Sequence, residues 1–507
     1  MHRVGCITGG LSHSNVVFTP TNELTSLCSA TNHPSPDLNF VLCRSVVMGD
    51  SGRVLTGERC RLNTRLNFGE PLPVILRNEK LLEPNDGYGN VDLENGETIT
   101  LSCEGGGDLS HPNAAPDRRL TTASVTCEGG DTFTNHNWLN APAKFFFFRC
   151  SYPPNHMSER TNRTCFDGHP IIEVGYRIQN QFHPLYETCF NEVTLNPIYS
   201  KYTQKAYNAL YQTKVQRPFF IDNNNYPQIP VQTLFSPWEQ KAAVAQLVGP
   251  LIESYFTKTE FLSRGHLAAK TDFVYAFGER ATFHYVNCAP QWTGFNGGNW
   301  NTLEVDLRNH IHASGYDTVI YTGTFGVTQL SNQFERKVDI YLYTDVNNNP
   351  VIPVPQYFYK VVYEPGSARG VAYVGINNPY YTPAEARELF FCEDICRRNN
   401  NFRWLSWHPD NPSEGYTFCC TVADFRDAVR HLPYFEQSCM FCNKYFLPPS
   451  CDPPTCDLIS RSEHSNKFST ILESNGTFKN GTVWREAVHP FLSIPSHSSI
   501  NRHESRT

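Results

Sequence analysis

The sequence predicts an α+β protein in which a small β domain linked by disulfides precedes a larger domain of mixed strands and helices. Short strand-like runs separated by Gly- and Asn-rich turns fill residues 56–190 and predict the β domain. Cysteines are scattered through the same region, as in domains that disulfides stabilise. From residue 191 to 442, strand-like runs mix with helix-like segments, which predicts an α+β domain with a mixed or antiparallel sheet.

The two ends of the chain differ from these domains. Residues 1–55 have no sustained period of a helix or a strand, so we expect a poorly ordered or foreign segment. Residues 443–507 are rich in Pro, Ser, His and Arg and have few large apolar side chains. Such a tail buries too little surface to offset the entropy of ordering it, and we expect disorder.

Within the β domain, the strand-like runs cover residues 60–63, 72–76, 98–103 and 123–127, and a further run follows at 171–176. The clearest helix signal starts at Ser236, where Pro237 takes the first helical position and Glu239 completes a capping-box pattern. The helix is predicted to continue to Val248, because Gly249 and Pro250 end helices. Further strands are predicted at 318–321 and 338–342.

The composition limits what the protein can be. The net charge is −7, so no general basic surplus marks a nucleic-acid binder. That does not exclude one, because an enzyme that releases a polyanionic product needs only a local basic groove. No stretch reaches the ~18 apolar residues that span a membrane, which predicts no membrane partner.

The chain has 18 cysteines, which favours an oxidising compartment. The following are too widely spaced for a zinc site and are expected in disulfides of open connectivity: Cys60, Cys103, Cys127, Cys150, Cys165 and Cys189. Four more predict two disulfides that do not join the adjacent pair: Cys392, Cys396, Cys419 and Cys420. A last group resembles a zinc knuckle, although its Pro-rich surroundings favour a reading without zinc: Cys439, Cys442, Cys451 and Cys456.

Glycosylation sequons start at Asn162, Asn475 and Asn480 and, with the cysteines, favour secretion of a glycoprotein. Residues 1–6 are not followed by the apolar core of a signal peptide. We therefore expect a secreted protein whose sequence starts from an incomplete or misjoined gene model.

Residues 261–310 carry the residue types that phosphodiester hydrolysis needs. His266 is the natural general base, because its ordinary pKa of ~6.5 lies near working pH. Asn296 and Glu304 offer oxygen ligands, which suit Mg²⁺ and also Mn²⁺. Arg264 and Arg308 can pair with phosphate oxygens. The sequence thus predicts a metal-dependent phosphodiesterase centre.

This segment closely resembles the DNA/RNA non-specific endonucleases, whose arthropod members include secreted and digestive nucleases. The resemblance rests on Arg264-Gly265-His266, on Asn287 with Pro290 and Gln291, and on Asn296, Glu304 and Arg308, all at the family's spacing from His266. It extends over about residues 230–432, and more loosely over the Cys-rich region.

The resemblance implies a ββα-metal nuclease core in which two strands and a helix enclose the ion. It further implies that His266 is the general base, Asn296 the direct metal ligand and Glu304 the residue that holds metal-bound water. Arg308 would assist the leaving phosphate, while Arg264 and Asn287 complete the catalytic set. The substrate would be DNA, RNA or both, cut without strong sequence specificity.

One residue departs from the family pattern. Many members have Asp before Arg-Gly-His, whereas this chain has Ser263. Losing the carboxylate could change the orientation or basicity of His266. We expect tuned rather than abolished activity, because the base, the ligand and both arginines persist.

Simpler interpretations remain for each of these residues. His266 could be a half-buried histidine, Asn296 part of a turn, and Glu304 and Arg308 a pair on a helix surface. Asn287 could only hold its turn together. Trp292 and Trp300 fit a core better than a base-stacking platform, and His310 and His312 fit a solvated helix end better than a second metal site.

Two rival functions follow from those interpretations. The first is a secreted protein that binds or scavenges nucleic acid with an impaired nuclease centre. The second is a disulfide-rich structural or adhesive protein that uses the same fold.

Overall fold

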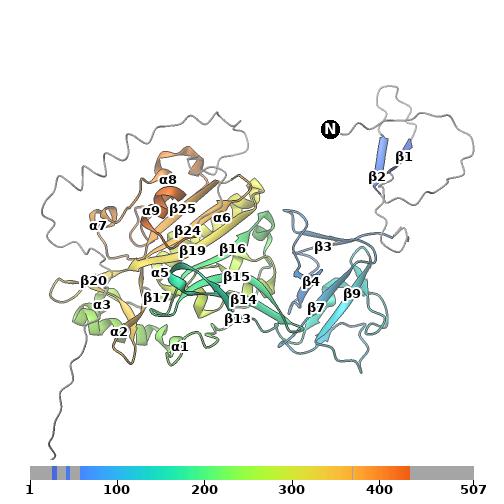
Figure 1. Ribbon diagram of the computed structural model, residues 1–507, viewed down its shortest axis with the longest axis horizontal. Coiled ribbons are helices and arrows are strands. Elements are labelled where there is room, and N and C mark those ends of the chain that lie inside the picture. Colours follow the sequence, from blue (N-terminus) through green and yellow to red (C-terminus); the bar gives the residue numbers. More distant parts are fainter. Residues whose placement is uncertain (1–25, 31–40, 46–56, 368, 434–507) are drawn as a thin grey trace, which may run out of the picture. The chain divides into compact units, whose positions relative to one another are not determined.

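The computed structural model describes residues 26–30, 41–45, 57–367 and 369–433, and it has the predicted α+β architecture (Figure 1). The expected tail at 443–507, the cysteines from Cys439 onward and the sequons at Asn475 and Asn480 lie outside the described residues. Most of residues 1–55 also lie outside, except for an antiparallel pair formed by β1 (Ser26–Ala30) and β2 (Val41–Ser45). The sequon residue Asn162 is exposed, so a glycan could reach it.

The Cys-rich region forms a six-stranded sheet with two short accessory pairs. In sheet order its strands are β11 (Ala143–Lys144), β10 (Thr132–Thr134), β9 (Thr122–Gly129), β7 (Thr98–Ser102), β4 (Val74–Arg77) and β5 (Lys80–Leu81). The accessory pairs are β3 (Cys60–Asn63) with β6 (Asn90–Leu93), and β8 (Leu109–Ser110) with β12 (Arg149–Cys150). Alternate residues such as Ile99, Leu101 and Val125 are fully buried, which is the pattern that predicted these strands.

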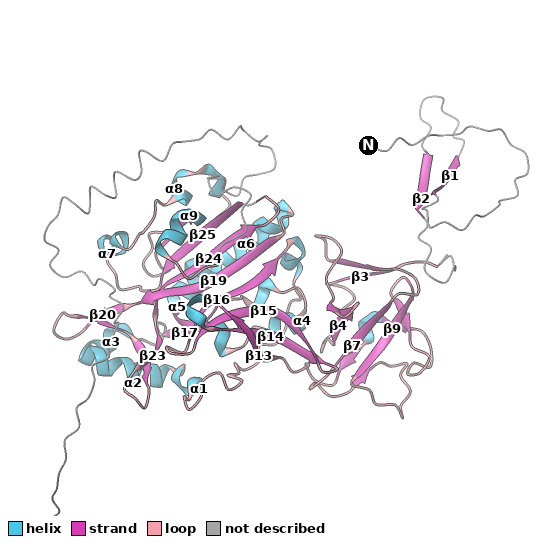
Figure 2. Cartoon of the chain, in the orientation of Figure 1, coloured by secondary structure: helices cyan, strands magenta, loops and turns pink. Residues whose placement is uncertain are grey.

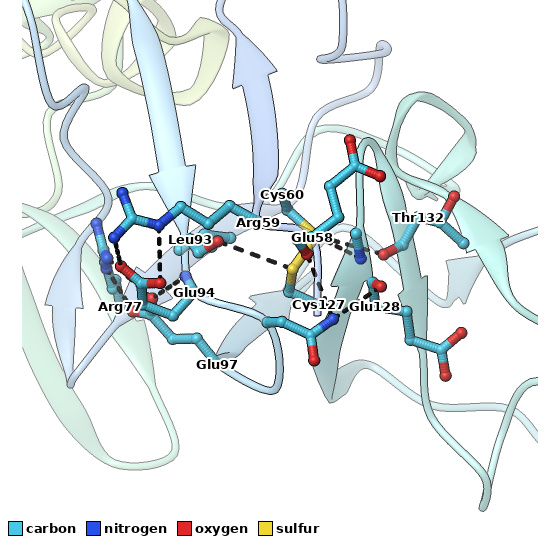
Figure 3. The surroundings of a disulfide bond; sticks show 12 residues. Glu58, Arg59, Cys60, Arg77, Leu93, Glu94, Glu97, Cys127, Glu128 and Thr132 are labelled. Carbon is cyan, nitrogen blue, oxygen red and sulfur yellow. Dashed lines mark hydrogen bonds and ion pairs between the residues drawn. A yellow bond between two sulfur atoms is a disulfide. The ribbon is translucent and has the colours of Figure 1, made fainter. Parts of the chain in front are cut away.

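Two disulfides link this region, as expected for a small domain with a modest core. Cys60–Cys127 joins β3 to β9, and Cys103–Cys150 joins the end of β7 to β12. Figure 3 shows the first of these beside two ion pairs, Arg59 with Glu94 and Arg77 with Glu97, each at 2.7 Å. These partly exposed pairs contribute little by themselves, so the covalent links and the core hold the domain.

An antiparallel sheet of eight strands forms the framework of the rest of the described chain (Figure 2). In order its strands are β13 (Met157–Thr164), β14 (Pro170–Ile178), β15 (Gln181–Asn191), β16 (Asn196–Gln204), β19 (Thr318–Val327), β24 (Pro355–Glu364), β25 (Arg369–Ile376) and β26 (Thr417–Thr421). The sequence predicted a mixed or antiparallel sheet, and the structure shows an antiparallel one.

Alternate residues of the central strands enter two separate cores, one on each face of this sheet. On one face, Ile320 and Val362 pack in the same core as Leu307 of α6 (Asn301–Ser314). On the other face, Tyr359 packs in the core that contains Phe425 of α9 (Val422–Ala428). Because a core covers each face of the sheet, the sequences of these strands are nearly continuous runs of apolar residues.

Further short elements surround this framework. The helices are α1 (Val231–Leu234), α2 (Pro237–Val248), α3 (Ile252–Tyr255), α4 (Ala276–Ala281), α5 (Thr293–Phe295), α7 (Pro383–Glu388) and α8 (Ile395–Arg398). The remaining strand pairs are β17 (Leu262–His266) with β18 (Cys288–Trp292), β20 (Gln329–Ser331) with β21 (Lys337–Asp339), and β22 (Tyr341–Thr344) with β23 (Pro350–Pro353). Helix α2 confirms the predicted bounds: the Ser236 side chain accepts from the N–H of Glu239 at 3.2 Å, and Gly249 ends the helix at φ 65°.

Three disulfides stabilise this part of the chain. Cys165–Cys189 joins the end of β13 to β15, while Cys392–Cys420 and Cys396–Cys419 fix α8 and its preceding loop to β26. The last two disulfides confirm the prediction that the adjacent cysteines, Cys419 and Cys420, do not bond to each other. Cys288 is buried and free.

The predicted domain boundary at residue 190 falls inside β15, the third strand of the eight-stranded sheet. Strands β13 and β14, which the sequence had grouped with the Cys-rich region, pair with β15 in that sheet. We therefore propose a boundary near residue 155, between β12 and β13.

Candidate active site

The segment singled out by sequence folds as two short strands followed by a helix. Strands β17 and β18 pair antiparallel, so that His266 lies opposite Cys288 and Ser263 opposite Gln291. The chain then passes through α5 and a π-helical turn, η7 (Asn296–Trp300), into α6 (Figure 1). Local sequence alone thus places His266 and Asn296 on one compact ββα unit.

Gly265 leaves room for the side chain that crosses its face of the hairpin. A Cβ atom built on Gly265 would lie 2.3 Å from Oε1 of Gln291, which no real contact permits. Gln291 is fully buried, and neither its Oε1 nor its Nε2 has a hydrogen-bond partner in the described part of the chain. A glycine is therefore required beside His266 because the buried Gln291 amide fills the space.

His266 is a neutral, half-buried imidazole among aromatic rings. Its ring centroid lies 5.0 Å from that of Phe220 and 4.9 Å from that of Phe283. Burial, helped by the charges of Arg217 and Lys270, lowers the pKa of His266 to about 3. Its Nε2 atom is buried and has no hydrogen-bond partner among the described residues. The ring is therefore unprotonated at neutral pH and can accept a proton.

Arg264 lies on the same side of β17 as His266, two residues away, and shares its aromatic neighbour. The guanidinium carbon lies 5.7 Å from the Phe220 ring centroid and 5.4 Å from that of Phe235. Its Nε donates to the Tyr285 hydroxyl at 3.2 Å, and one terminal nitrogen donates to the Gln232 carbonyl at 3.2 Å. The side chain is thus held in place without a carboxylate partner in the described residues, so its charge remains available to an anion.

Asn296, the predicted metal ligand, is tied to β17 through Ser263. Its Nδ2 donates to the Ser263 Oγ at 2.9 Å, and that hydroxyl donates to the Gln291 carbonyl at 2.8 Å. The Oδ1 atom of Asn296 accepts no hydrogen bond within the described ranges. Ser263 therefore orients the amide and leaves its oxygen free.

Glu304 and Arg308 lie one turn apart on α6, but they do not form the simple surface pair that was the alternative. Arg308 is 4% exposed and forms an ion pair at 3.0 Å with Asp272, which is 2% exposed. Burial raises the pKa of Glu304, while the charge of Lys360 opposes that change. Both side chains belong to a charged cluster that also contains Asp272 and Lys360.

The sequence reasoning missed the partners in that cluster. Asp272 accepts hydrogen bonds from the Tyr202 hydroxyl at 2.6 Å and from the Gln204 amide at 3.1 Å. Lys360, which is fully buried, donates to Tyr202 at 2.9 Å and to Thr322 at 2.8 Å. One sequence signal could have revealed Lys360, because it interrupts the aromatic and aliphatic run from Tyr357 to Val362, and buried lysines are nearly always paired.

Asn287 is fully buried and uses its side chain to close a turn. Its Oδ1 accepts from the Ala268 N–H and the Ser200 hydroxyl, both at 2.9 Å. Its Nδ2 donates to the carbonyls of Ala268 at 3.0 Å and Thr282 at 2.9 Å. Both ends of the Asn287 amide are thus hydrogen-bonded to other groups of the protein. We therefore propose that Asn287 positions the residues after His266 and does not touch substrate.

The other candidates have structural roles. Trp292 and Trp300 are 0% and 1% exposed, which confirms them as core residues. His312 contacts the Ala206 carbonyl at 2.9 Å, and the His310 ring stacks on Trp404 at 4.3 Å. In the described ranges, a single trio of His, Cys, Asp or Glu side chains lies close enough to share a metal: Asp394, Cys396 and Cys419, whose two cysteines form a disulfide.

The site residues fit a hard divalent cation. Asn296 offers a free amide oxygen that is already oriented by Ser263. Glu304 offers a carboxylate whose ionised form is destabilised by burial, and a cation would relieve that cost. Oxygen donors of this kind suit Mg²⁺ or Mn²⁺ and not a soft metal.

Comparison with known proteins shows which proteins this chain is similar to. Residues 167–425, more than half of the chain, match the family model of DNA/RNA non-specific endonucleases. A salivary endonuclease of Lutzomyia longipalpis is 28% identical over 349 residues, which cover 68% of this chain and 75% of that protein. The salivary protein Tsal2A of Glossina morsitans morsitans is 27% identical, covering 72% and 89%. A chain from the crystal structure of the EndoG/EndoGI complex aligns with 20% identity over 39% of this chain and 74% of its own, with a TM-score of 0.26.

Proposed function

Since this chain belongs to the DNA/RNA non-specific endonuclease family and is therefore a nuclease that hydrolyses phosphodiester bonds, we propose that His266 is its general base and that Asn296 and Glu304 hold its metal ion. The family is metal-dependent, and Mg²⁺ is the ion we assign, with Mn²⁺ as the alternative. The single observation that carries the proposal is the free Oδ1 of Asn296, oriented by Ser263 on the strand that ends in His266.

The chain's own residues divide the work as follows. The neutral imidazole of His266 takes a proton from the attacking water, for which its lowered pKa leaves it unprotonated. Arg264, fixed by Tyr285 and Gln232, directs its remaining N–H groups to phosphate oxygens. Arg308 is held by its buried ion pair with Asp272, which compensates its charge, so we assign it to holding Glu304 and α6 in place. When bound, the cation neutralises charge on the phosphate and its leaving oxygen.

Low sequence specificity follows from contacts of this type. Arginines and a cation recognise the phosphate backbone, which is the same for every base. We therefore assign DNA, RNA or both as substrates.

We also assign the chain to the secretory route. Five disulfides join cysteines of the described residues, and the relatives named above include salivary proteins. In the part of the chain that the structure describes, no helix combines the length and the apolar character that crossing a bilayer needs.

Replacement of His266 tests the proposal directly. We expect H266A to cleave plasmid DNA and double-stranded RNA at least ~10²-fold more slowly than the wild type in Mg²⁺. EDTA should abolish cleavage by the wild type. The matched control is H136A, because His136 is exposed in the N-terminal β region. Full activity of H266A, or cleavage that persists in EDTA, would overturn the assignment.

A further inference from the structure

The segment that precedes the site, residues 214–221, exposes an aromatic side chain beside the candidate base. Phe219 is 93% exposed, more than any other large apolar side chain of the described residues. Single exposed apolar residues are ordinary on protein surfaces. The place of this one is not ordinary, because its neighbour Phe220 packs directly on His266.

Contacts of the two following residues, Phe220 and Ile221, hold the backbone next to Phe219 in place. Phe220 packs on the rings of Phe283 at 5.0 Å and Tyr285 at 5.5 Å. The Ile221 N–H donates to the Phe283 carbonyl at 3.1 Å, and the Tyr285 N–H donates to the Ile221 carbonyl at 3.0 Å. Consecutive Cα atoms lie ~3.8 Å apart, so the backbone of Phe219 lies next to that of Phe220, whose ring packs on His266.

Positive charge accompanies this ring. Arg217 is exposed and forms no ion pair with a carboxylate in the described residues, and its guanidinium carbon lies 5.1 Å from the Phe283 ring centroid. Its charge reaches His266, whose pKa it lowers. Arg264 contributes a second cation without a carboxylate partner in the described residues, with its guanidinium carbon 5.7 Å from the Phe220 ring centroid. An exposed ring whose neighbour Phe220 is contacted by one such cation, with a second on the adjoining Phe283 ring, is complementary to a polyanion that also carries flat aromatic bases.

We propose that Phe219 stacks on a base of the substrate strand next to the phosphate that is cut. This inference rests on the proposed function and extends it to the substrate class. A base can offer its face to Phe219 only where it is unpaired or at a frayed end, because neighbours in a duplex cover both faces. The ring thus favours binding of single strands and of unpaired stretches in a duplex, with little dependence on which base is met.

The test measures binding without cleavage. Fluorescent single-stranded and duplex oligonucleotides are titrated with full-length protein in EDTA, and Kd is read from anisotropy. We expect F219A to weaken single-strand binding about 5- to 50-fold and duplex binding far less, while F219W binds as the wild type does. The control is F334A, since Phe334 is 69% exposed and lies outside the site segment. In Mg²⁺, F219A should raise KM for single strands with kcat within about 2-fold.

Three results would overturn the inference: wild-type binding by F219A, equal losses on single strands and duplexes, or the same loss in F334A. Failure of the proposed function looks different. If the wild type does not cleave in Mg²⁺, His266 loses its assignment, while the anisotropy titration still decides the role of Phe219.

Discussion

The Nδ2 atom of Asn296 donates a hydrogen bond to the Ser263 Oγ at 2.9 Å, and this bond spans from the turn before α6 to strand β17. An amide can turn either its oxygen or its nitrogen toward a cation, and only the oxygen binds one. Because the serine hydroxyl accepts from the nitrogen, the oxygen faces away from it. The Ser263 hydroxyl thus fixes which way the Asn296 amide faces.

Replacing Ser263 should therefore change the Mg²⁺ concentration that cleavage needs more than it changes the maximal cleavage rate. We expect S263A to raise the Mg²⁺ concentration for half-maximal cleavage several-fold, because the Asn296 amide loses its acceptor. S263T keeps the hydroxyl and should keep the wild-type requirement. Mg²⁺ titrations of the initial rate compare the three proteins at equal folded fraction. Identical Mg²⁺ curves for S263A and the wild type would contradict the orienting role.

A second prediction concerns the buried pair of Asp272 and Arg308. D272N removes the charge that compensates Arg308, which is 4% exposed, and uncompensated buried charges cost about 3–5 kcal/mol. We expect a large fall in the free energy of unfolding and a loss of at least ~10-fold in kcat/KM. Chemical denaturation and initial rates are the measurements.

The matched control for D272N is E253Q. Glu253 pairs with Lys241 at 2.7 Å on the surface, and its side chain is 75% exposed. Removing such a pair should change the free energy of unfolding by no more than about 1 kcal/mol. If D272N and E253Q behave alike, the buried cluster does not support the site.

How much the sequence could predict depends on how local each feature is. Residues 261–310 contain both strands β17 and β18 and helix α6, so the motif from Arg264 to Arg308 and the family resemblance it carries were enough to imply the ββα unit. The cap of Ser236 and the end at Gly249 were equally local and gave correct helix bounds. In each case, neighbouring residues alone decide the structure.

The features that the sequence missed depend on pairing between distant segments. Strand β13 looks like part of the Cys-rich region, and only its register with β14 places it in the large sheet. Asp272 meets Tyr202 and Arg308 because η5 (Lys270–Asp272), β16 and α6 converge, and no spacing in the chain encodes that meeting. Such contacts carry no periodic signal, so sequence patterns cannot reveal them.

The third prediction is a loss of stability in mild acid. His156 Nδ1 and His284 Nε2 lie 2.9 Å apart in a hydrogen bond between two neutral rings. Burial lowers the pKa of His156 to about 4 and that of His284 well below its ordinary value. The unfolded chain takes up protons below pH ~6.5, whereas the folded chain does not. Stability is therefore full above pH ~6.5 and falls as the pH drops toward 4, by up to about 1.4 kcal/mol per pH unit for each histidine.

Thermal unfolding at pH 7, 6 and 5 measures this slope. The double variant H156Q/H284Q can keep a side-chain hydrogen bond without a titratable ring, so its Tm should fall less between pH 7 and 5. The control H136Q, in which an exposed histidine is replaced, should follow the wild type. A double variant as acid-sensitive as the wild type would exclude the pair as the cause.

The last prediction concerns Asn299, which anchors the turn that carries Asn296. It is fully buried, and its Nδ2 donates to the carbonyls of His408 at 2.9 Å and Gly415 at 2.5 Å. Its Oδ1 accepts from the His408 N–H at 2.7 Å. N299A would leave these backbone groups without partners at a cost of about 1–3 kcal/mol each. We expect a lower Tm together with a higher Mg²⁺ requirement, because the turn loosens around Asn296.

N301A, an exposed neighbour at the start of α6, serves as the control and should change neither quantity. A lower Tm with an unchanged Mg²⁺ curve would show that Asn299 supports the fold but does not position the metal ligand.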